Sequence, residues 1–312
     1  MLRWLLSLFF TLILSGCTNL QRLAHIYSDE APPAQTFQYF DGSSSLYYSF
    51  SVGDAAQART AIFFYGGTGC PSWKSVMPGY VEGLSVDARI FVLNKRFVAD
   101  RSTGLFECGE DFQRTNLPAQ WVADYREFIQ AQLRAAQRPL EQVVLVGVSE
   151  GAIPAVAIAS QMPEVTHLAL IGAGGYSMRE NLATLKRKGA IWFDVDSGWQ
   201  KIAADPQSLE KNWYGNSYRW WSAMMDLDPM PALSQLNIPI FIGVGERDES
   251  VPVESARYLA ERFQQMGKTN LILKVYPGAD HRLTRSNHSY RPEYFATLSC
   301  LLRSMHCSAA GH

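Results

Sequence analysis

The sequence predicts an α/β protein with a doubly wound, mainly parallel sheet. Short runs of aliphatic and β-branched residues recur along the chain, as expected of strands that are buried on both faces. Helix-forming segments separate these runs, among them an amphipathic stretch at residues 119–137 and an alanine-rich stretch at about 150–161. Strands and helices that alternate in this way are typical of a parallel sheet with helices on both faces.

Length and composition are compatible with one large domain. The chain has 312 residues, of which 47% are hydrophobic and 18% are charged, enough to bury a large core. The net charge of -1 argues against nucleic acid as a partner. No spacing of metal ligands and no internal repeat stands out, and we expect neither a metal nor a cofactor.

The N-terminus carries the pattern of an export signal. Arg3 precedes an apolar run at residues 4–14, which is too short to span a bilayer as a stable anchor but suits a signal peptide. The run ends at Leu14-Ser15-Gly16-Cys17, which resembles a bacterial lipobox. This resemblance implies that Cys17 is lipidated and tethers the protein to a membrane. The alternatives are an ordinary secretory signal that is cleaved nearby and, less favoured, a signal anchor that stays uncleaved.

This interpretation divides the chain into three regions. Residues 1–16 are a lipoprotein signal peptide, residues 17–35 are a tether, and residues 36–307 form the folded domain. Thr18 after the cysteine favours the outer membrane, by analogy with lipoprotein sorting. We therefore expect a lipid-anchored protein of the cell envelope, on the periplasmic face of that membrane.

The elements of the domain follow from the spacing of apolar residues and turn residues. Residues 94–116 read as a loop. Strands are predicted at 37–40, 46–52, 60–65, 88–93, 143–148, 165–171, 238–245 and 271–276, and helices at 73–84, 119–137 and 150–161.

The segment at about 176–236 interrupts this alternation and is rich in tryptophan and tyrosine. An insertion at this point of such a sheet is expected to form a helical lid over the site, where aromatic side chains can line a pocket for an apolar group. Alternatively, each aromatic side chain only holds the lid against the rest of the domain.

The strand at 143–148 runs into Gly147-Val148-Ser149-Glu150-Gly151, a G-x-S-x-G pattern with a helix behind it. A serine that attacks a carbonyl must project from a sharp, strained turn, and the two glycines let strand and helix pass close to it. The following helix points its first N–H groups at the space beside the serine. We therefore predict a nucleophile at Ser149 and an oxyanion donor in the backbone N–H of Glu150.

A serine hydroxyl becomes reactive when an imidazole takes its proton and a carboxylate holds that imidazole. Asp248 lies in the loop after the strand at 238–245, where Glu246 and Glu249 compete for the role. His281 follows the strand at 271–276 and the turn residues 277–280. The chain order serine, acid, histidine favours Ser149, Asp248 and His281 as a catalytic triad.

A second oxyanion donor is expected from the strand at 60–65, which runs into Gly66-Gly67-Thr68-Gly69. The glycines expose backbone N–H groups, and we assign the donors to Gly67 and Thr68. A phosphate-binding turn is disfavoured because neither G-K-[ST] nor G-x-G-x-x-G follows.

Together these motifs resemble the α/β-hydrolase superfamily over about residues 37–305. The resemblance implies an α/β-hydrolase fold and a serine hydrolase that forms an acyl-enzyme without a cofactor. Tyr65 replaces the histidine of the H-G-G-G loop of lipases and carboxylesterases. A carboxylic ester is the expected substrate, because an alcohol leaves without the protonation that an amine requires.

Other functions stay open. The same triad could serve a peptidase or an acyltransferase, and Glu150 could then bind a substrate amine rather than only complement the helix dipole. A different class is a binding lipoprotein of the envelope that keeps the fold without turnover.

Four cysteines remain once Cys17 is set aside, and export would place them in an oxidising compartment. We favour a Cys70–Cys108 disulfide, since both residues fall in loops at one edge of the sheet, and a Cys300–Cys307 disulfide, since the two are near in sequence. Four free thiols are the alternative.

Overall fold

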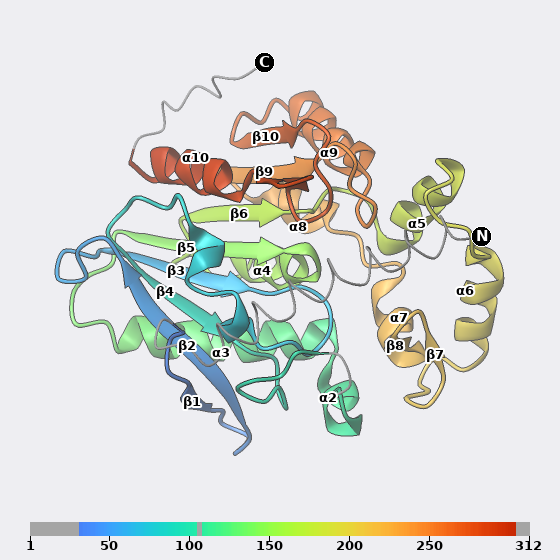
Figure 1. Ribbon diagram of the computed structural model, residues 1–312, viewed down its shortest axis with the longest axis horizontal. Helices are drawn as coiled ribbons and strands as arrows, with labels where there is room; N and C mark the ends of the chain where they lie inside the picture. The colour runs from blue at the N-terminus through green and yellow to red at the C-terminus, as the bar shows by residue number, and fades with distance from the viewer. Residues whose placement is uncertain (1–30, 105–107, 304–312) are drawn as a thin grey trace, which may run out of the picture.

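A computed structural model describes residues 31–104 and 108–303. Its centre is an eight-stranded sheet in the order β1-β2-β4-β3-β5-β6-β9-β10 (Figure 1). β1 and β2 pair antiparallel at one edge, β2 pairs antiparallel with β4, and every later neighbour is parallel. The strands are β1 (Gln35–Gln38), β2 (Ser44–Val52), β3 (Thr60–Tyr65), β4 (Ala88–Leu93), β5 (Gln142–Val148), β6 (His167–Ile171), β9 (Ile240–Gly245) and β10 (Leu271–Tyr276).

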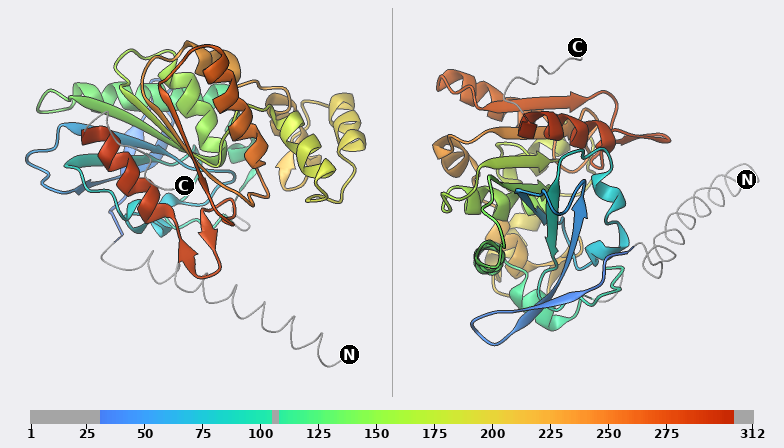
Figure 2. Two further views of the ribbon diagram at one scale, coloured as in Figure 1. Left: turned by 90° about the horizontal axis from the view of Figure 1, so that it is seen from above. Right: turned by 90° about the vertical axis from the view of Figure 1, so that its left-hand side faces the viewer.

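Helices cover both faces of the sheet (Figure 2), and the side chains of the central strands show why. On β5, Val143 and Leu145 belong to the apolar core of one face, whereas Val144 and Val146 belong to the core of the other. The first face is covered by α3 (Pro118–Arg134), α4 (Ala152–Ala159) and α9 (Val253–Gln265), and the second by α10 (Arg291–Arg303) and two short 3₁₀ helices, η1 (Trp73–Ser75) and η2 (Gly79–Val81). The predicted doubly wound, mainly parallel α/β sheet is therefore confirmed.

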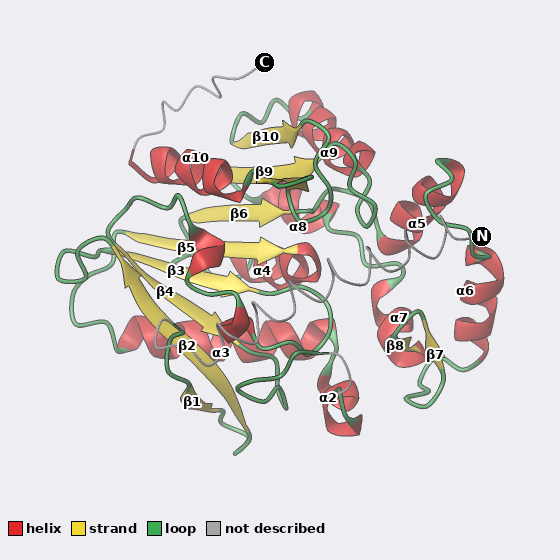
Figure 3. Cartoon of the chain, viewed as in Figure 1, coloured by secondary structure: helices red, strands yellow, loops and turns green. Residues whose placement is uncertain are grey.

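Most of the insertion at residues 176–236 lies beyond the carboxyl ends of β5, β6 and β9 (Figure 3), whereas its last helix, α8 (Met230–Gln235), lies beside α4. Its apolar side chains, such as Leu182, Trp220 and Trp221, join the same core as α4. The insertion contains α5 (Met178–Arg187), α6 (Val195–Ala204), α7 (Tyr218–Met224), α8 (Met230–Gln235) and the short pair β7 (Asn212–Trp213) and β8 (Asn216–Ser217).

Two local expectations were wrong. The helix predicted at 73–84 is split into η1 and η2, since Pro78 has no N–H to continue a helix and Gly79 weakens one. The segment at 94–116 was predicted to be a loop but contains α2 (Glu110–Thr115), whose buried Phe112 packs against Cys70 and Val98.

The N-terminal region that carries the lipobox, Cys17 included, lies outside the described residues. Across residues 31–104 and 108–303 no helix is long and apolar enough to cross a membrane.

Candidate active site

Ser149 occupies a strained turn at the end of β5. It is the first residue of the short 3₁₀ helix η3 (Ser149–Gly151). Its φ of 55° is a backbone conformation that residues other than glycine rarely adopt. A Cβ on Gly147 would lie 2.7 Å from the Cα of Ala152, and one on Gly151 would overlap the carbonyl oxygens of Tyr65 and Gly66. The two glycines thus permit the close approach of strand and helix that places Ser149 at the tip of the turn.

Asp248 and His281 come together across the loops that follow β9 and β10. The imidazole Nδ1 of His281 lies 2.9 Å from Oδ1 and 2.8 Å from Oδ2 of Asp248, whose side chain is fully buried. The backbone N–H groups of Ser250 and Val251 donate to Oδ1 of Asp248, at 2.8 and 2.7 Å. The carboxylate is therefore held in place and can orient the ring.

The pKa of His281 is raised above its ordinary value. Burial alone lowers the pKa, but the hydrogen bond to Asp248 and the negative charges of Asp248, Glu249 and Asp280 outweigh that effect. The surroundings therefore favour the imidazolium that forms when His281 accepts a proton.

The two competing carboxylates have other partners. Glu246 accepts a hydrogen bond from the backbone N–H of Gly278 at 2.8 Å, and Glu249 accepts one from the backbone N–H of His281 at 3.3 Å. In the described residues only Asp248 is hydrogen-bonded to the imidazole of His281.

Ser149 and His281 line one cavity of about 660 Å³. Gly172, which follows β6, lies directly against the histidine. A Cβ there would come within 2.7 Å of Cε1 of His281 and 3.6 Å of Oδ2 of Asp248. Among the described residues no hydrogen bond joins the Ser149 hydroxyl to the imidazole, a contact that often tightens only when substrate binds.

The glycine-rich loop after β3 faces the serine. A Cβ on Gly67 would lie 3.6 Å from the Cβ of Ser149, and both Gly67 and Thr68 line the cavity. Within the described part of the chain, neither backbone N–H donates to another residue. Both groups can therefore serve an oxyanion.

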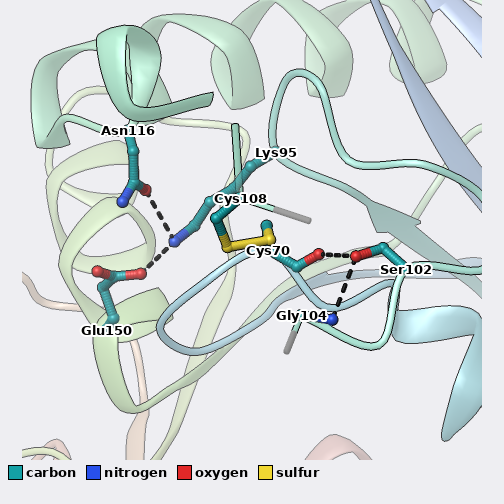
Figure 4. Close-up of a disulfide and its surroundings, with 7 residues drawn as sticks. All are labelled: Cys70, Lys95, Ser102, Gly104, Cys108, Asn116 and Glu150. Atoms are coloured by element: carbon teal, nitrogen blue, oxygen red, sulfur yellow. Dashed lines mark hydrogen bonds and ion pairs between the residues drawn. A yellow bond between two sulfur atoms is a disulfide. The ribbon is translucent and has the colours of Figure 1, made fainter. Parts of the chain in front are cut away.

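Glu150 is held by residues far away in the sequence. Lys95, after β4, forms an ion pair with Oε2, and the indole N–H of Trp220 on α7 donates to Oε1 at 2.8 Å. Lys95 also donates to Asn116 at 3.2 Å (Figure 4). Its ammonium lies 4.5 Å from the ring centroid of Trp121. Because the Glu150 side chain is only 2% exposed and already has these partners, a substrate amine would have to displace them.

Cys70 and Cys108 form a disulfide, which is the pairing favoured from the sequence (Figure 4). Cys70 follows the glycine-rich loop directly, and its carbonyl accepts a hydrogen bond from the hydroxyl of Ser102 at 2.6 Å. The disulfide therefore ties the predicted oxyanion loop to the segment before α2. Cys300 lies in α10 and Cys307 lies outside the described residues, so their pairing stays a prediction.

Sequence reasoning missed Lys95, Asn116 and Gly172. Lys95 and Asn116 lie in a segment without a recognisable motif, and Gly172 follows the strand predicted at 165–171 with no signal of its own. Of the other histidines, His25, His306 and His312 lie outside the described residues, and neither His167 nor His288 lines the cavity. The described residues contain no cluster of metal ligands.

The sheet, the elbow serine and the histidine held by a buried aspartate define a serine hydrolase with the α/β-hydrolase fold. The chain belongs to the prolyl oligopeptidase family (Peptidase_S9), which matches residues 97–304. The uncharacterized peptidase YuxL of Bacillus subtilis (strain 168) is 30% identical over 80 residues, which are 26% of this chain and 11% of that protein. The match thus spans only a small part of that relative's length.

Solved structures share the fold at low identity. The proline iminopeptidase of Mycobacterium smegmatis superposes with a TM-score of 0.59 at 15% identity, over 87% of this chain and 98% of that one. An acylaminoacyl peptidase of Pyrococcus horikoshii superposes with a TM-score of 0.58 at 13% identity, over 90% of this chain and 43% of that one. The esterase Pf2001 of Pyrococcus furiosus superposes with a TM-score of 0.55 at 15% identity, over 89% of this chain and 95% of that one.

Proposed function

We propose that this protein hydrolyses carboxylic esters through an acyl-enzyme, with Ser149, Asp248 and His281 as its catalytic triad. The observation that carries the proposal is the cavity itself, where the strained elbow serine and the Asp248-bound histidine both line the wall. The cavity is also mostly lined by apolar side chains, including Ile153, Leu182 and Trp221, which suits an apolar acyl or alcohol group.

The chemistry runs in two halves. The hydroxyl oxygen of Ser149 attacks the carbonyl carbon while its proton passes to His281, and the resulting oxyanion accepts hydrogen bonds from the backbone N–H groups of Glu150, Gly67 and Thr68. The C–O bond to the alcohol breaks as the imidazolium returns its proton to the leaving oxygen. Water then attacks the acyl carbon while His281 takes its proton. The bond from that carbon to the Ser149 oxygen breaks, the imidazolium returns the proton to this oxygen, and the acid leaves.

A peptidase is the second candidate, and the family membership supports it. A peptidase that recognises a substrate amine through Glu150 is disfavoured, because the Glu150 carboxylate already interacts with Lys95 and Trp220. An acyltransferase would share the acyl-enzyme but give it to an alcohol instead of water. An envelope-binding lipoprotein without turnover would require the three side chains to be idle.

A fluorophosphonate probe tests the serine. We expect it to label Ser149, and we expect Ser149→Ala to abolish labelling without unfolding the protein. p-Nitrophenyl esters of graded length, assayed beside aminoacyl anilides, then separate esterase from peptidase. Well-folded protein that is neither labelled nor active would favour the binding alternative, and faster anilide cleavage would favour the peptidase.

Asp248→Asn tests the acid. It should lower kcat by roughly 10³–10⁴, because the imidazole loses the carboxylate that holds its tautomer. Glu246→Gln is the matched control, since its carboxylate bonds only to the Gly278 backbone among the described residues. Equal losses in the two variants would remove Asp248 from the triad.

We further propose export and lipidation at Cys17, which would anchor the enzyme at the outer membrane on its periplasmic side. The support is the sequence before Cys17 and the Cys70–Cys108 disulfide, which suits an oxidising compartment. A labelled fatty acid should enter the full-length chain in bacterial cells but not its Cys17→Ala variant. Secretion of an unlabelled, shortened chain would point to an ordinary signal peptide instead.

A further inference from the structure

The cavity beside Ser149 has two chemically different sides. Leu185, Trp220 and Met224 of the insertion line one side and belong to the core on the α4 face of the sheet. The other side includes Val76 and Tyr80, which belong to the core on the α10 face. β5 contributes to both cores, and Ser149 at its end therefore borders both sides. A substrate bound at Ser149 would extend into two different environments.

Two arginines belong to the second side. Arg282 follows His281 directly, Arg291 opens α10, and both line the cavity. The guanidinium of Arg291 lies 4.7 Å from the ring centroid of Tyr80, and its Nε donates to the hydroxyl of Ser289 at 3.2 Å. Burial raises the pKa of Tyr80 to about 12, and the charges of Arg291 and Arg282 oppose that rise. Arg291 thus lies over the Tyr80 ring, and Arg282 lines the same cavity close enough for its charge to act on Tyr80.

The nearby carboxylates are engaged elsewhere. Glu150 is paired with Lys95, and Glu249 accepts a hydrogen bond from the backbone of His281. The carboxylate of Asp280 accepts from the backbone N–H of Arg282 and from Thr284. Among the described residues no carboxylate lies within ion-pairing distance of either guanidinium. This contrasts with Arg96, which contacts both Asp41 and Asp124.

We propose that Arg282 and Arg291 form a subsite for a carboxylate of the substrate. The preferred ester would then carry an apolar group against the insertion and an acidic group on the other side of the scissile bond. Guanidinium groups bind carboxylates through paired, charge-assisted hydrogen bonds, and two of them beside a histidine can select an anion over a neutral group of the same shape. This inference rests on the proposed ester hydrolysis and adds a substrate class to it.

Matched substrates test the subsite. Mono-p-nitrophenyl adipate places a carboxylate on the acyl side. Its neutral counterpart is p-nitrophenyl adipamate, in which a carboxamide replaces that carboxylate. 3-Carboxyphenyl butyrate places the carboxylate on the alcohol side, and 3-carbamoylphenyl butyrate is its neutral counterpart. We expect the wild type to favour the anionic member of one pair by roughly tenfold in kcat/KM at low salt. The preference should shrink as ionic strength rises.

Variants then assign the preference to the arginines. In Arg282→Gln/Arg291→Gln the ratio between anionic and neutral esters should fall toward one. Arg291→Lys, which keeps the charge and the packing on Tyr80, should retain part of it. Arg285→Gln removes the same charge from an exposed residue of the neighbouring strand β11 (Thr284–Arg285) that does not line the cavity, and should leave the ratio unchanged.

Two results would overturn the subsite while leaving the esterase intact. One is a wild type that hydrolyses both members of each pair equally, and the other is a preference that survives the double substitution in variants still labelled by fluorophosphonate. If the folded wild type neither reacts with fluorophosphonate nor hydrolyses any ester, the proposed function fails and the subsite fails with it.

Discussion

Lys95 forms a buried ion pair with Glu150, the residue that follows the elbow serine. The two side chains are 10% and 2% exposed, and they join the segment after β4 to the start of the elbow turn. Trp220 extends the contact to α7 of the insertion. A carboxylate next to the predicted oxyanion site would oppose a second negative charge, and the ammonium of Lys95 offsets it.

Lys95→Met should therefore damage both stability and chemistry. It leaves the Glu150 carboxylate buried with Trp220 as its one remaining side-chain partner among the described residues, which costs about 3–5 kcal/mol of unfolding free energy. It should also lower kcat more than it changes KM. Urea unfolding and ester kinetics measure the two effects. Lys95→Met/Glu150→Gln should recover much of both, since it removes the unpaired charge.

The exposed pair of Arg59 and Glu141 supplies the control. Its side chains are 57% and 63% exposed, and Arg59→Met should cost less than about 1 kcal/mol. If Lys95→Met costs no more than Arg59→Met and leaves kcat intact, the pair has no role in positioning.

The pH profile should follow His281. Only the neutral imidazole can accept the serine proton, and a raised pKa means that this form appears at higher pH than usual. The acid limb of kcat/KM should thus have its midpoint above the ordinary histidine value of 6.5. Glu249→Gln removes a charge that raises the pKa of His281, and should move the midpoint to lower pH. An unmoved midpoint, or an equal shift in Glu246→Gln, would contradict this account.

Gly172→Ala should impair catalysis through His281. The added methyl group would meet the imidazole, so kcat should fall by about tenfold or more while the protein still folds. Gly267→Ala is a matched control, because its φ of 69° resembles the 61° of Gly172 but its Cβ would meet nothing within 4 Å. Both variants should lose about 1 kcal/mol of stability, and only Gly172→Ala should lose activity. Similar activity in both would show that the close contact is harmless.

Cys70→Ser/Cys108→Ser should loosen the predicted oxyanion loop. The disulfide spans 38 residues, and its removal should cost about 2–4 kcal/mol. Since Gly67 and Thr68 lie just before Cys70, kcat should fall more than KM rises. Denaturant unfolding and steady-state kinetics report the two quantities. Full kcat in the double variant would separate the disulfide from the oxyanion loop.

The parts of this protein that have short-range sequence signals could be predicted without coordinates. The parallel sheet follows from apolar runs such as residues 143–148, and the elbow follows from five consecutive residues around Ser149. Chain order and the position of each residue after a predicted strand then pointed to Asp248 and His281, which the structure brings within hydrogen-bonding distance.

Contacts between distant segments could not be predicted in this way. Lys95 and Glu150 are separated by 55 positions, and nothing in either local sequence indicates the other. The same holds for Gly172, whose role depends on where His281 lies in space. The helix predicted at 73–84 was wrong for a local reason, because Pro78 and Gly79 break the helix that the apolar spacing suggested.

Because Ser149 has a positive φ, the residue that gives activity at this position is not the one that gives the highest stability. Alanine and glycine at 149 would both abolish the nucleophile, but only glycine is at ease in that backbone conformation. The glycine variant should therefore resist heat better than the alanine variant, with a difference of about 1 kcal/mol. Keeping serine at position 149 therefore retains backbone strain that a glycine would relieve, at the cost of the nucleophile.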